Sequence, residues 1–218
     1  MSPKRIRPPI VLTAVAALLA RWPRVALRLG DWETGALSDL LGPDPVAPIW
    51  VAGLARSGST LLIEALARHC EVGTHRHRDF PLVAAPWWWS LAVRATPRLP
   101  ARPRERAHGD GMLVTPESPD AYEEMIWALA EVAGEEFPRF HRDHLRKLLY
   151  VRGRGRYAAK ANEHVARLPT LKGLYPDARF VVPVRDPVDQ IASLMRQHER
   201  FVEAGRRNAG IPRHMRLA

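Results

Sequence analysis

The chain has 218 residues, enough to bury one hydrophobic core, and its 46% hydrophobic and 26% charged residues are ordinary for a globular protein. Its formal net charge is +10, and arginine supplies all but four of the 33 basic residues. Such a charge favours acidic ligands such as nucleotides, nucleic acid, anionic sugars or membrane surfaces. The alternative is that it reflects only a genomic bias toward arginine. The single cysteine, Cys70, excludes an intrachain disulfide and a cysteine-rich metal site, and fits a cytoplasmic protein.

Residues 1–45 are predicted to form a helical extension. A basic start is followed by an apolar run over residues 9–20, which is too short to span a bilayer as a helix. The run resembles the core of a signal peptide, but no clear cleavage site of small residues follows, so a secretory signal or membrane anchor is the alternative interpretation. Arg21, Arg24 and Arg28 recur at helical intervals. We therefore predict two short amphipathic helices, interrupted by a proline, that pack on the domain or mediate oligomer contacts.

Residues 46–218 are predicted to form the one domain of the chain, to which this extension is attached. Residues 49–53 are continuously apolar, which is typical of a parallel strand buried on both faces. A helix is expected over residues 58–70, because apolar residues recur along one of its faces. Residues 71–90 have no clear pattern, and residues 91–111, rich in proline and arginine, are expected to form a loop.

The rest of the chain alternates helices and strands. Ser118 is a plausible N-cap of the next helix, because acidic residues follow it in the first turns. Asn162 and Asp186 are candidate caps of two later helices, and Pro187 occupies the first position of the second one. The other predicted elements are a helix over residues 138–151, a helix over residues 162–175, and buried strands over residues 156–161 and 178–184. This order predicts an α/β, three-layer, P-loop-like fold with a central parallel β-sheet flanked by helices.

The loop between the first strand and the first helix of this domain has the spacing of a phosphate-binding P-loop. Its sequence, GLARSGST, matches G-x-x-x-x-G-K-[ST], except that Ser59 replaces the lysine that reaches the outer phosphates of a nucleoside triphosphate. A strand, a tight turn and a helix N-terminus together present backbone N–H groups and a positive dipole end to an anion. The candidate ligands of that anion are Arg56, Ser57, Gly58, Ser59 and Thr60. A strand–turn–helix junction without a ligand is the alternative.

A second anion site is predicted at the same edge of the sheet. Arg185 follows the strand over residues 178–184, and Ser193 lies about two turns into the next helix. Ligands of open α/β sheets bind beyond the carboxyl ends of the strands, where the first loop also lies. These two side chains can therefore hold a second phosphate, unless Arg185 is a structural ion-pair partner and Ser193 a surface hydroxyl.

Together, GLARSGSTLL and RFVVPVRDPVDQIAS resemble the sulfotransferase family, in its bacterial, carbohydrate and tyrosylprotein branches. The resemblance covers residues 46–206, and the intervening AKANEHVARLPTLKGLYPDARF is also similar to the family. It implies the donor 3′-phosphoadenosine 5′-phosphosulfate (PAPS) and transfer of its sulfuryl group to a hydroxyl of a carbohydrate, a phenol or tyrosine, or a small alcohol. The acceptor itself is not readable from the sequence.

The resemblance also implies roles for individual residues. The first loop holds the 5′-phosphosulfate, and Arg185 and Ser193 hold the 3′-phosphate. Arg56 and Lys160 are the implied catalytic cations, and no metal is expected because these side chains supply the positive charge. Many members carry a later Gly-rich loop that closes over the 3′-phosphate, and the sequence ends before such a loop. The chain is therefore interpreted as a truncated member or a short form.

The acceptor hydroxyl needs a general base, which some members of the family place after the first helix. His75 is the first candidate, because the pKa of an unperturbed imidazole suits proton transfer near neutral pH. The alternatives in the same stretch, CEVGTHRHRDF, are His77, Asp79 and Glu71.

Three other classes of function fit parts of the sequence. A P-loop kinase would need the missing lysine and a magnesium-binding carboxylate after a strand, and Asp186 is better explained as a helix cap. The arginine runs at residues 102–106 and 152–156 suggest nucleic-acid binding, but no recognisable nucleic-acid module accompanies them. A nucleotide-binding protein without activity is the third alternative.

Overall fold

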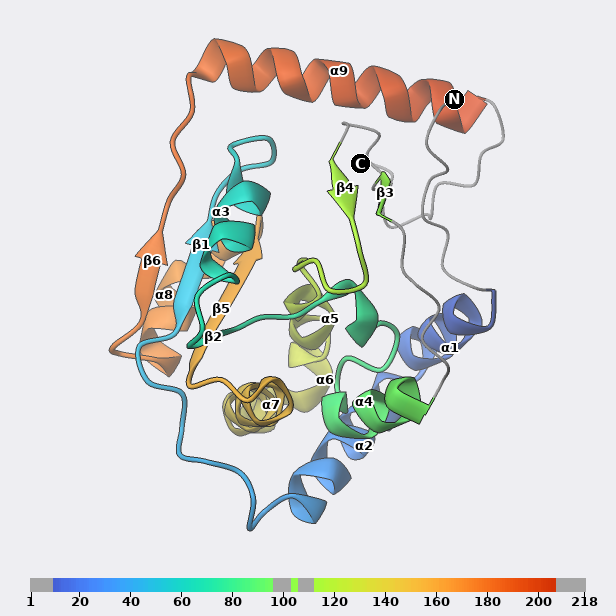
Figure 1. The fold of residues 1–218 in the computed structure, drawn as a ribbon, viewed down its shortest axis with the longest axis vertical. Helices are drawn as coiled ribbons and strands as arrows, with labels where there is room; N and C mark the ends of the chain where they lie inside the picture. The colour runs from blue at the N-terminus through green and yellow to red at the C-terminus, as the bar shows by residue number, and fades with distance from the viewer. Residues whose placement is uncertain (1–9, 96–102, 106–111, 207–218) are drawn as a thin grey trace.

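The computed structural model describes residues 10–95, 103–105 and 112–206. It is an α/β fold around a four-stranded parallel sheet with the strand order β2-β5-β1-β6 (Figure 1). The strands are β1 (Ile49–Ala52), β2 (Val72–Gly73), β5 (Arg156–Ala161) and β6 (Arg179–Val181). The predicted α/β class, with a central parallel sheet flanked by helices, is confirmed.

The helices pack on both faces of this sheet and extend away from it. They are α1 (Ile10–Arg21), α2 (Pro23–Ala36), α3 (Ser59–Leu66), α4 (Pro86–Ala95), α5 (Glu123–Trp127), α6 (Ala130–Ala133), α7 (Phe137–Arg152), α8 (His164–Leu174) and α9 (Pro187–Arg206). Two 3₁₀ turns, η1 (His77–Asp79) and η2 (Gly134–Glu136), and an antiparallel pair, β3 (Arg104–Glu105) and β4 (Leu113–Val114), complete the described elements. Figure 1 shows α3 and α8 on opposite sides of the sheet, and α9 crossing beyond its carboxyl end.

β1 is a central strand, and both of its neighbours come from later in the chain. In the register of the sheet, Trp50 lies opposite Ala159 of β5 and Phe180 of β6. All four residues of β1 are buried, as expected for a continuously apolar strand in a parallel sheet. The loop that leaves the end of β1 therefore lies in the middle of the carboxyl edge, between the ends of two other strands.

Two strands of the sheet differ from the prediction. β2 was not predicted, because a strand of two residues is too short to produce a periodic pattern; both residues pair with β5. The strand predicted as buried over residues 178–184 is the three-residue edge strand β6, and Val182 and Val184 beyond it are exposed. The prediction of burial from this apolar run was wrong, because among the described residues β6 has a partner strand on one side only.

The two N-terminal helices are confirmed, and the chain bends by 98° between α1 and α2. The helix predicted over residues 58–70 is also confirmed, although α3 is shorter. The loop expected over residues 91–111 is wrong in part, since α4 continues to Ala95 and β3 pairs with β4. The rest of that loop lies outside the described residues.

Of the three predicted helix caps, only Asp186 is confirmed. Its Oδ1 accepts two backbone N–H groups of the first turn of α9, at 2.9 and 3.2 Å. Ser118 instead accepts a hydrogen bond from the N–H of Thr115 within a turn, and α5 begins only later. Asn162 lies one residue before Glu163, the actual cap position of α8, which makes no side-chain capping bond. A short polar side chain suits turns as well as caps, so the pattern alone did not separate them.

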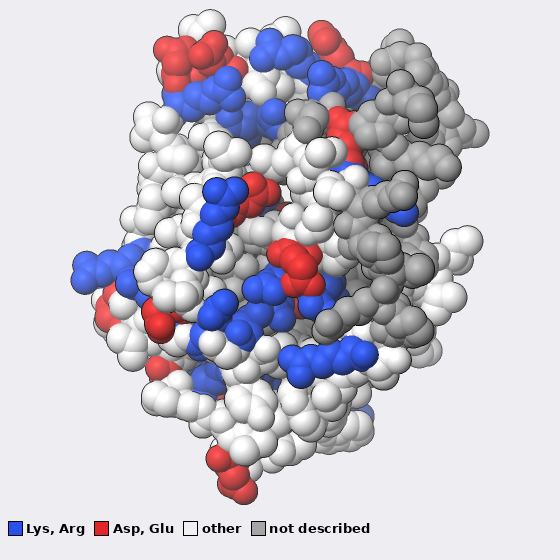
Figure 2. All heavy atoms as spheres, in the orientation of Figure 1, with Lys and Arg blue, Asp and Glu red and all other residues white. Residues whose placement is uncertain are grey.

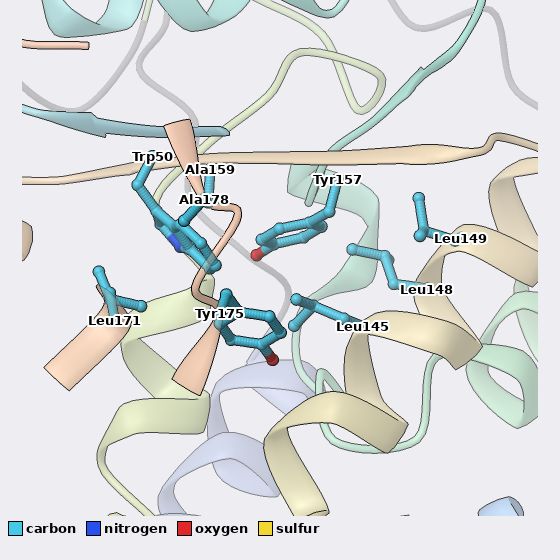
Figure 3. Packing of buried hydrophobic residues seen from close by; sticks show 9 residues of the cluster. All are labelled: Trp50, Leu145, Leu148, Leu149, Tyr157, Ala159, Leu171, Tyr175 and Ala178. Carbon is cyan, nitrogen blue, oxygen red and sulfur yellow. The ribbon is translucent and has the colours of Figure 1, made fainter. Parts of the chain in front are cut away.

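The core joins the sheet to α7 and α8 (Figure 3). Its buried residues are Trp50, Leu145, Leu148, Leu149, Tyr157, Ala159, Leu171, Tyr175 and Ala178. Trp50 is at the centre, with its ring 5.0 Å from that of Tyr175 and 6.1 Å from that of Phe180, centroid to centroid. A second cluster, which includes Ala26 of α2 and Phe140 of α7, attaches the N-terminal helices to the same body.

A buried carboxylate lies beside this core. Glu123, at the start of α5, is fully buried and accepts hydrogen bonds from four donors of other side chains. These donors are Trp50 Nε1, Trp127 Nε1, His141 Nε2 and the Tyr157 hydroxyl. His164 Nε2 lies 3.5 Å from the same carboxylate. Burial raises the pKa of Glu123, but the charge of His164 and the hydrogen bond from His141 outweigh it, so the pKa lies well below 4.5.

We expect Glu123→Gln to destabilise the fold by about 3 kcal/mol, because the amide would lose the charge and turn an NH₂ group toward buried donors. Urea denaturation followed by circular dichroism measures this change. The neighbouring Glu124→Gln is a matched control, since Glu124 pairs with Arg167 in a half-buried position and should cost less than about 1 kcal/mol. Equal effects of the two substitutions would contradict the role of Glu123.

Candidate active site

The loop after β1 is held in an unusual backbone conformation. Arg56 has a φ of 67°, a left-handed value that is uncommon for a residue other than glycine, and Gly58 has a φ of 97° directly before α3. Gly53 has no room for a side chain, because a Cβ there would lie 2.7 Å from Pro183 Cγ and from Ser57 Oγ. Strained backbone of this kind is concentrated at ligand sites. The loop thus turns the N-terminus of α3 outward at the carboxyl edge of the sheet.

The start of α9 and the residue before its cap bind this loop directly. Arg185 donates from Nη1 to the carbonyl oxygen of Arg56 at 3.2 Å, and Gln190 donates from Nε2 to the carbonyl of Ala55 at 2.9 Å. The Nε–H of Arg56 donates to Ser193 Oγ at 2.9 Å. The structure therefore brings Arg56, Arg185 and Ser193 together, and adds Gln190, which sequence reasoning missed although it lies between the two motif residues.

Lys160 belongs to a second polar group at the same edge. It lies opposite Val51 in the register of β1 and β5, one residue before β1 ends. Its Nζ is 3.3 Å from Asp120 Oδ1, and Asp120 Oδ2 is 3.3 Å from His77 Nε2. The other ring nitrogen of His77 lies 3.3 Å from the hydroxyl of Tyr122. Figure 2 shows basic and acidic side chains interleaved in the middle of the face drawn there.

The charges of this group keep Asp120 ionised. Burial raises the pKa of Asp120, but the charges of Lys160 and His77 lower it further, so that its pKa lies below the usual value. Burial, followed by the charge of Asp120, raises the pKa of Tyr122, so that its hydroxyl stays protonated. The ionised Asp120 therefore faces Nε2 of His77, while Nδ1 of the same ring faces the Tyr122 hydroxyl.

Comparison with protein-family models assigns the fold and these motifs to a family. The model described as the sulfotransferase family matches residues 48–214, most of the chain. This chain belongs to the sulfotransferase family. A comparison with curated proteins found no match.

Two solved sulfotransferases resemble this family member in fold. STF1 from Mycobacterium tuberculosis H37Rv is 17% identical, with a TM-score of 0.48 over 84% of this chain and 57% of its own. STF9 from Mycobacterium avium is 16% identical, with a TM-score of 0.48 over 84% of this chain and 53% of its own. The chain thus spans little more than half the length of these two proteins, and likeness at this level carries no information about the site.

In this family member, the other candidate bases lie away from the loop or are enclosed. The side chain of His75 is 1% exposed, against 20% for His77, and its Nε2 faces Nε2 of His144 at 3.2 Å in the interior. Asp79 is buried and bonded through both oxygens to Arg152 Nη2. Burial raises the pKa of Asp79, but the neighbouring His75, with Nδ1 3.6 Å from Oδ2, and the charge of Arg152 lower it more. Glu71 lies at the amino end of β5, where its carbonyl accepts the N–H of the strand's first residue.

The loop carries a polar atom that suits a phosphate. Ser57 Oγ is buried, and within the described residues it has no hydrogen-bond partner. The N–H of Ser57 donates to the carbonyl of Leu54 at 3.2 Å, whereas its hydroxyl is the group without such a bond. The N–H groups of the first turn of α3, from Ser59 on, have no intrahelical acceptor by the geometry of any helix. The hydroxyl and this turn together fit the oxygens of a phosphosulfate.

Sequence reasoning missed Asp120 and Tyr122 because no local pattern marks them. Asp120 follows Pro119, which forms an isolated β-bridge with Arg76, and its contact with Lys160 depends on the pairing of β5 with β1. The N–H of Asp120 also donates to the carbonyl of His75 at 3.2 Å, which ties this turn to the stretch that carries His77. Only the tertiary structure makes one site of these segments.

The buried imidazole of His144 makes stability depend on pH. Burial, followed by the charges of His75 and Lys147, holds the pKa of His144 well below 6.5. The unfolded chain therefore binds a proton that the folded chain does not, so this contribution is full above about pH 6.5 and is lost as pH falls. We expect the free energy of unfolding to fall by up to about 1.4 kcal/mol per pH unit between pH 6 and 5 from this group.

His144→Gln should reduce that slope in urea denaturation series measured across pH. His198→Gln, at an exposed position of α9, is the control and should leave the slope unchanged. A slope that His144→Gln leaves intact would mean that another group titrates instead.

Proposed function

We propose that the chain is a PAPS-dependent sulfotransferase that moves a sulfuryl group to a hydroxyl acceptor, leaving 3′-phosphoadenosine 5′-phosphate. The observation that carries this proposal is the direct contact between the two motifs, Arg56 with Ser193 and Arg185 with the Arg56 carbonyl. A triphosphate site would need the lysine that Ser59 replaces. The contacts favour a donor with two separate phosphate groups.

PAPS would be held by the loop after β1, by Arg185 and Ser193, and by the link that Arg56 makes between them. Ser57, Ser59, Thr60 and the turn around Gly58 would bind the 5′-phosphosulfate through hydroxyls and backbone N–H groups. Arg185 and Ser193 would bind the 3′-phosphate, with Arg185 able to donate two parallel hydrogen bonds. Since Arg56 already links the loop to Ser193, it would also keep the two phosphate sites in register.

The bound donor supplies an electrophilic sulfuryl group whose bond to the phosphate oxygen breaks as the acceptor oxygen bonds to sulfur. Arg56 and Lys160 would stabilise negative charge on the departing oxygen, because both carry a positive charge at the carboxyl edge of the sheet. Asp120 holds the Lys160 ammonium from the other side and would keep it directed along that edge.

The base of this proposal is His77 rather than His75. His77 is partly exposed, and its Nε2 faces the ionised Asp120, which would stabilise the ring after it accepts a proton. The proton of the acceptor hydroxyl would pass to Nδ1, where the Tyr122 hydroxyl now lies at 3.3 Å. His75 would have to leave the interior to play this part.

The proposal includes a cytoplasmic location, supported by the free thiol of Cys70. The class of acceptor, whether carbohydrate, phenol, tyrosine or small alcohol, is left to the assay below.

Nucleotide binding tests the donor site. We expect 3′-phosphoadenosine 5′-phosphate to raise the melting temperature, while ATP with magnesium does not. Arg185→Ala should weaken the binding at least about tenfold, because a charge-assisted contact is lost. Arg179→Ala is the matched control, since this exposed arginine lies at the opposite, amino end of β6. A response to ATP with magnesium alone would favour a kinase, and loss of binding in the Arg179 variant would leave no special role for Arg185.

Transfer of labelled sulfate from PAPS to a panel of hydroxyl acceptors tests the chemistry. We expect His77→Gln to lower kcat by roughly 10²–10⁴-fold and to leave the affinity for 3′-phosphoadenosine 5′-phosphate unchanged, because a general base acts on the acceptor. His69→Gln, at an exposed position after α3, is the control. Full activity of the His77 variant, together with loss of activity in a folded His75→Gln variant, would return the role to His75.

A further inference from the structure

The helix α1 is apolar and lies on the surface. It has the sequence IVLTAVAALLAR, and none of its residues is buried. Ile10 is 88% exposed, Val11 71% and Leu18 51%. Figure 1 shows α1 at the side of the molecule away from the sheet. A helix whose large apolar side chains are exposed together on a globular protein marks an interaction site.

The exposed side chains form a stripe. Val11, Val15 and Leu18 follow each other at helical intervals and are all exposed, whereas Leu19 packs against the buried cluster of α2 and α7. One face of α1 therefore attaches it to the body and another is free for a ligand. On α2 the exposed side chains of Val25 and Trp32 continue the apolar surface past the bend.

The charged residues of α1, and those of α2 as far as Gly30, are all positive. Arg21, Arg24 and Arg28 are exposed at the end of α1 and along α2. In the sequence they are preceded by Lys4, Arg5 and Arg7, and the first acidic residue of the chain is Asp31. An apolar stripe flanked by arginines, with tryptophan near the helix ends, matches the composition of helices that lie in the interface of a membrane. We name the exposed residues of α1 and of α2 up to Trp32 the α1–α2 surface.

The geometry of α1 and α2 favours binding to the surface of a bilayer over crossing it. Among the described helices, no single one is both long and apolar enough to cross a membrane, and α1 with α2 reaches that length only as a pair bent by 98°. A second copy of the chain is disfavoured, because a two-fold contact would bring the same arginines face to face. We propose that the α1–α2 surface binds the surface of a bilayer that contains anionic lipids.

This proposal stands apart from the proposed sulfotransferase activity. None of the residues of the α1–α2 surface belongs to the loop after β1, to α9 or to the group around Asp120. Lipid binding can therefore be measured without donor or acceptor, and its failure would leave the donor-site experiments unaffected.

Flotation of the full chain with lipid vesicles tests the proposal. We expect binding to vesicles of phosphatidylglycerol and phosphatidylcholine, and at least about tenfold weaker binding to phosphatidylcholine alone. Binding should also decline as salt is added, because the attraction to the lipid headgroups is screened. Changing Arg21, Arg24 and Arg28 together to Gln should weaken binding to the anionic vesicles by about 100-fold. The double variant Val11→Ser, Leu18→Ser should weaken it at least about tenfold.

Matched variants separate this surface from net charge and general hydrophobicity. The triple change Arg68→Gln, Arg179→Gln, Arg196→Gln removes equal charge from exposed positions elsewhere and should keep binding within about threefold. The double change Leu40→Ser, Val165→Ser removes two exposed apolar side chains outside the α1–α2 surface and should also keep binding within about threefold. Thermal unfolding of each variant confirms that it folds.

Three outcomes would overturn the proposal. The first is equal binding of neutral and anionic vesicles, and the second is an equal loss of binding in the control and test variants. The third is the absence of vesicle binding together with a dimer, in analytical ultracentrifugation, that Val11→Ser with Leu18→Ser dissociates. That last result would assign the surface to a second copy of the chain.

Discussion

The buried carboxylate of Glu123 joins the sheet to the helices α5, α7 and α8. Its donors come from β1, β5, α5 and α7, and His164 of α8 lies beside it. A charge without water is costly, so the fold is favourable only when all of these partners are in place. The carboxylate thereby specifies how the sheet, α7 and α8 meet, which the apolar core around Trp50 alone would not do.

The same interaction positions the candidate active site. Asp120 lies three residues before Glu123 in the sequence, and the hydrogen bond between Glu123 and Tyr157 of β5 holds this segment against the sheet. The turn around Asp120 can therefore reach Lys160 at the end of β5, and on its other side the stretch that carries His77. The hydrogen bonds of the buried Glu123 thus help to fix the segment that carries Asp120, a charged residue of the candidate site.

The parts of the site that could be predicted are those encoded by consecutive residues. The loop GLARSGST and the pair Arg185 and Ser193 each lie within one strand–turn–helix unit, and the alternation of strands and helices placed both units at one edge. What escaped prediction depends on contacts between distant segments. Asp120 and Tyr122 have no local sequence signal. The choice between His75 and His77 depends on which of the two side chains faces the interior. Ser118, too, was assigned to a helix cap because polar residues have the same local pattern in turns.

The sequence by itself determined the α/β class, the positions of the first strand and of the two motifs proposed to bind phosphate, and the basic, apolar character of the N-terminal helices. These properties follow from periodicity, turn chemistry and composition, which act over a few residues. The tertiary structure decided that β6 is an edge strand, that Arg56 contacts Ser193, and that α1 exposes its apolar stripe. Those outcomes depend on which surfaces remain uncovered after the core has formed, and burial is a property of the whole packed chain rather than of any segment in it.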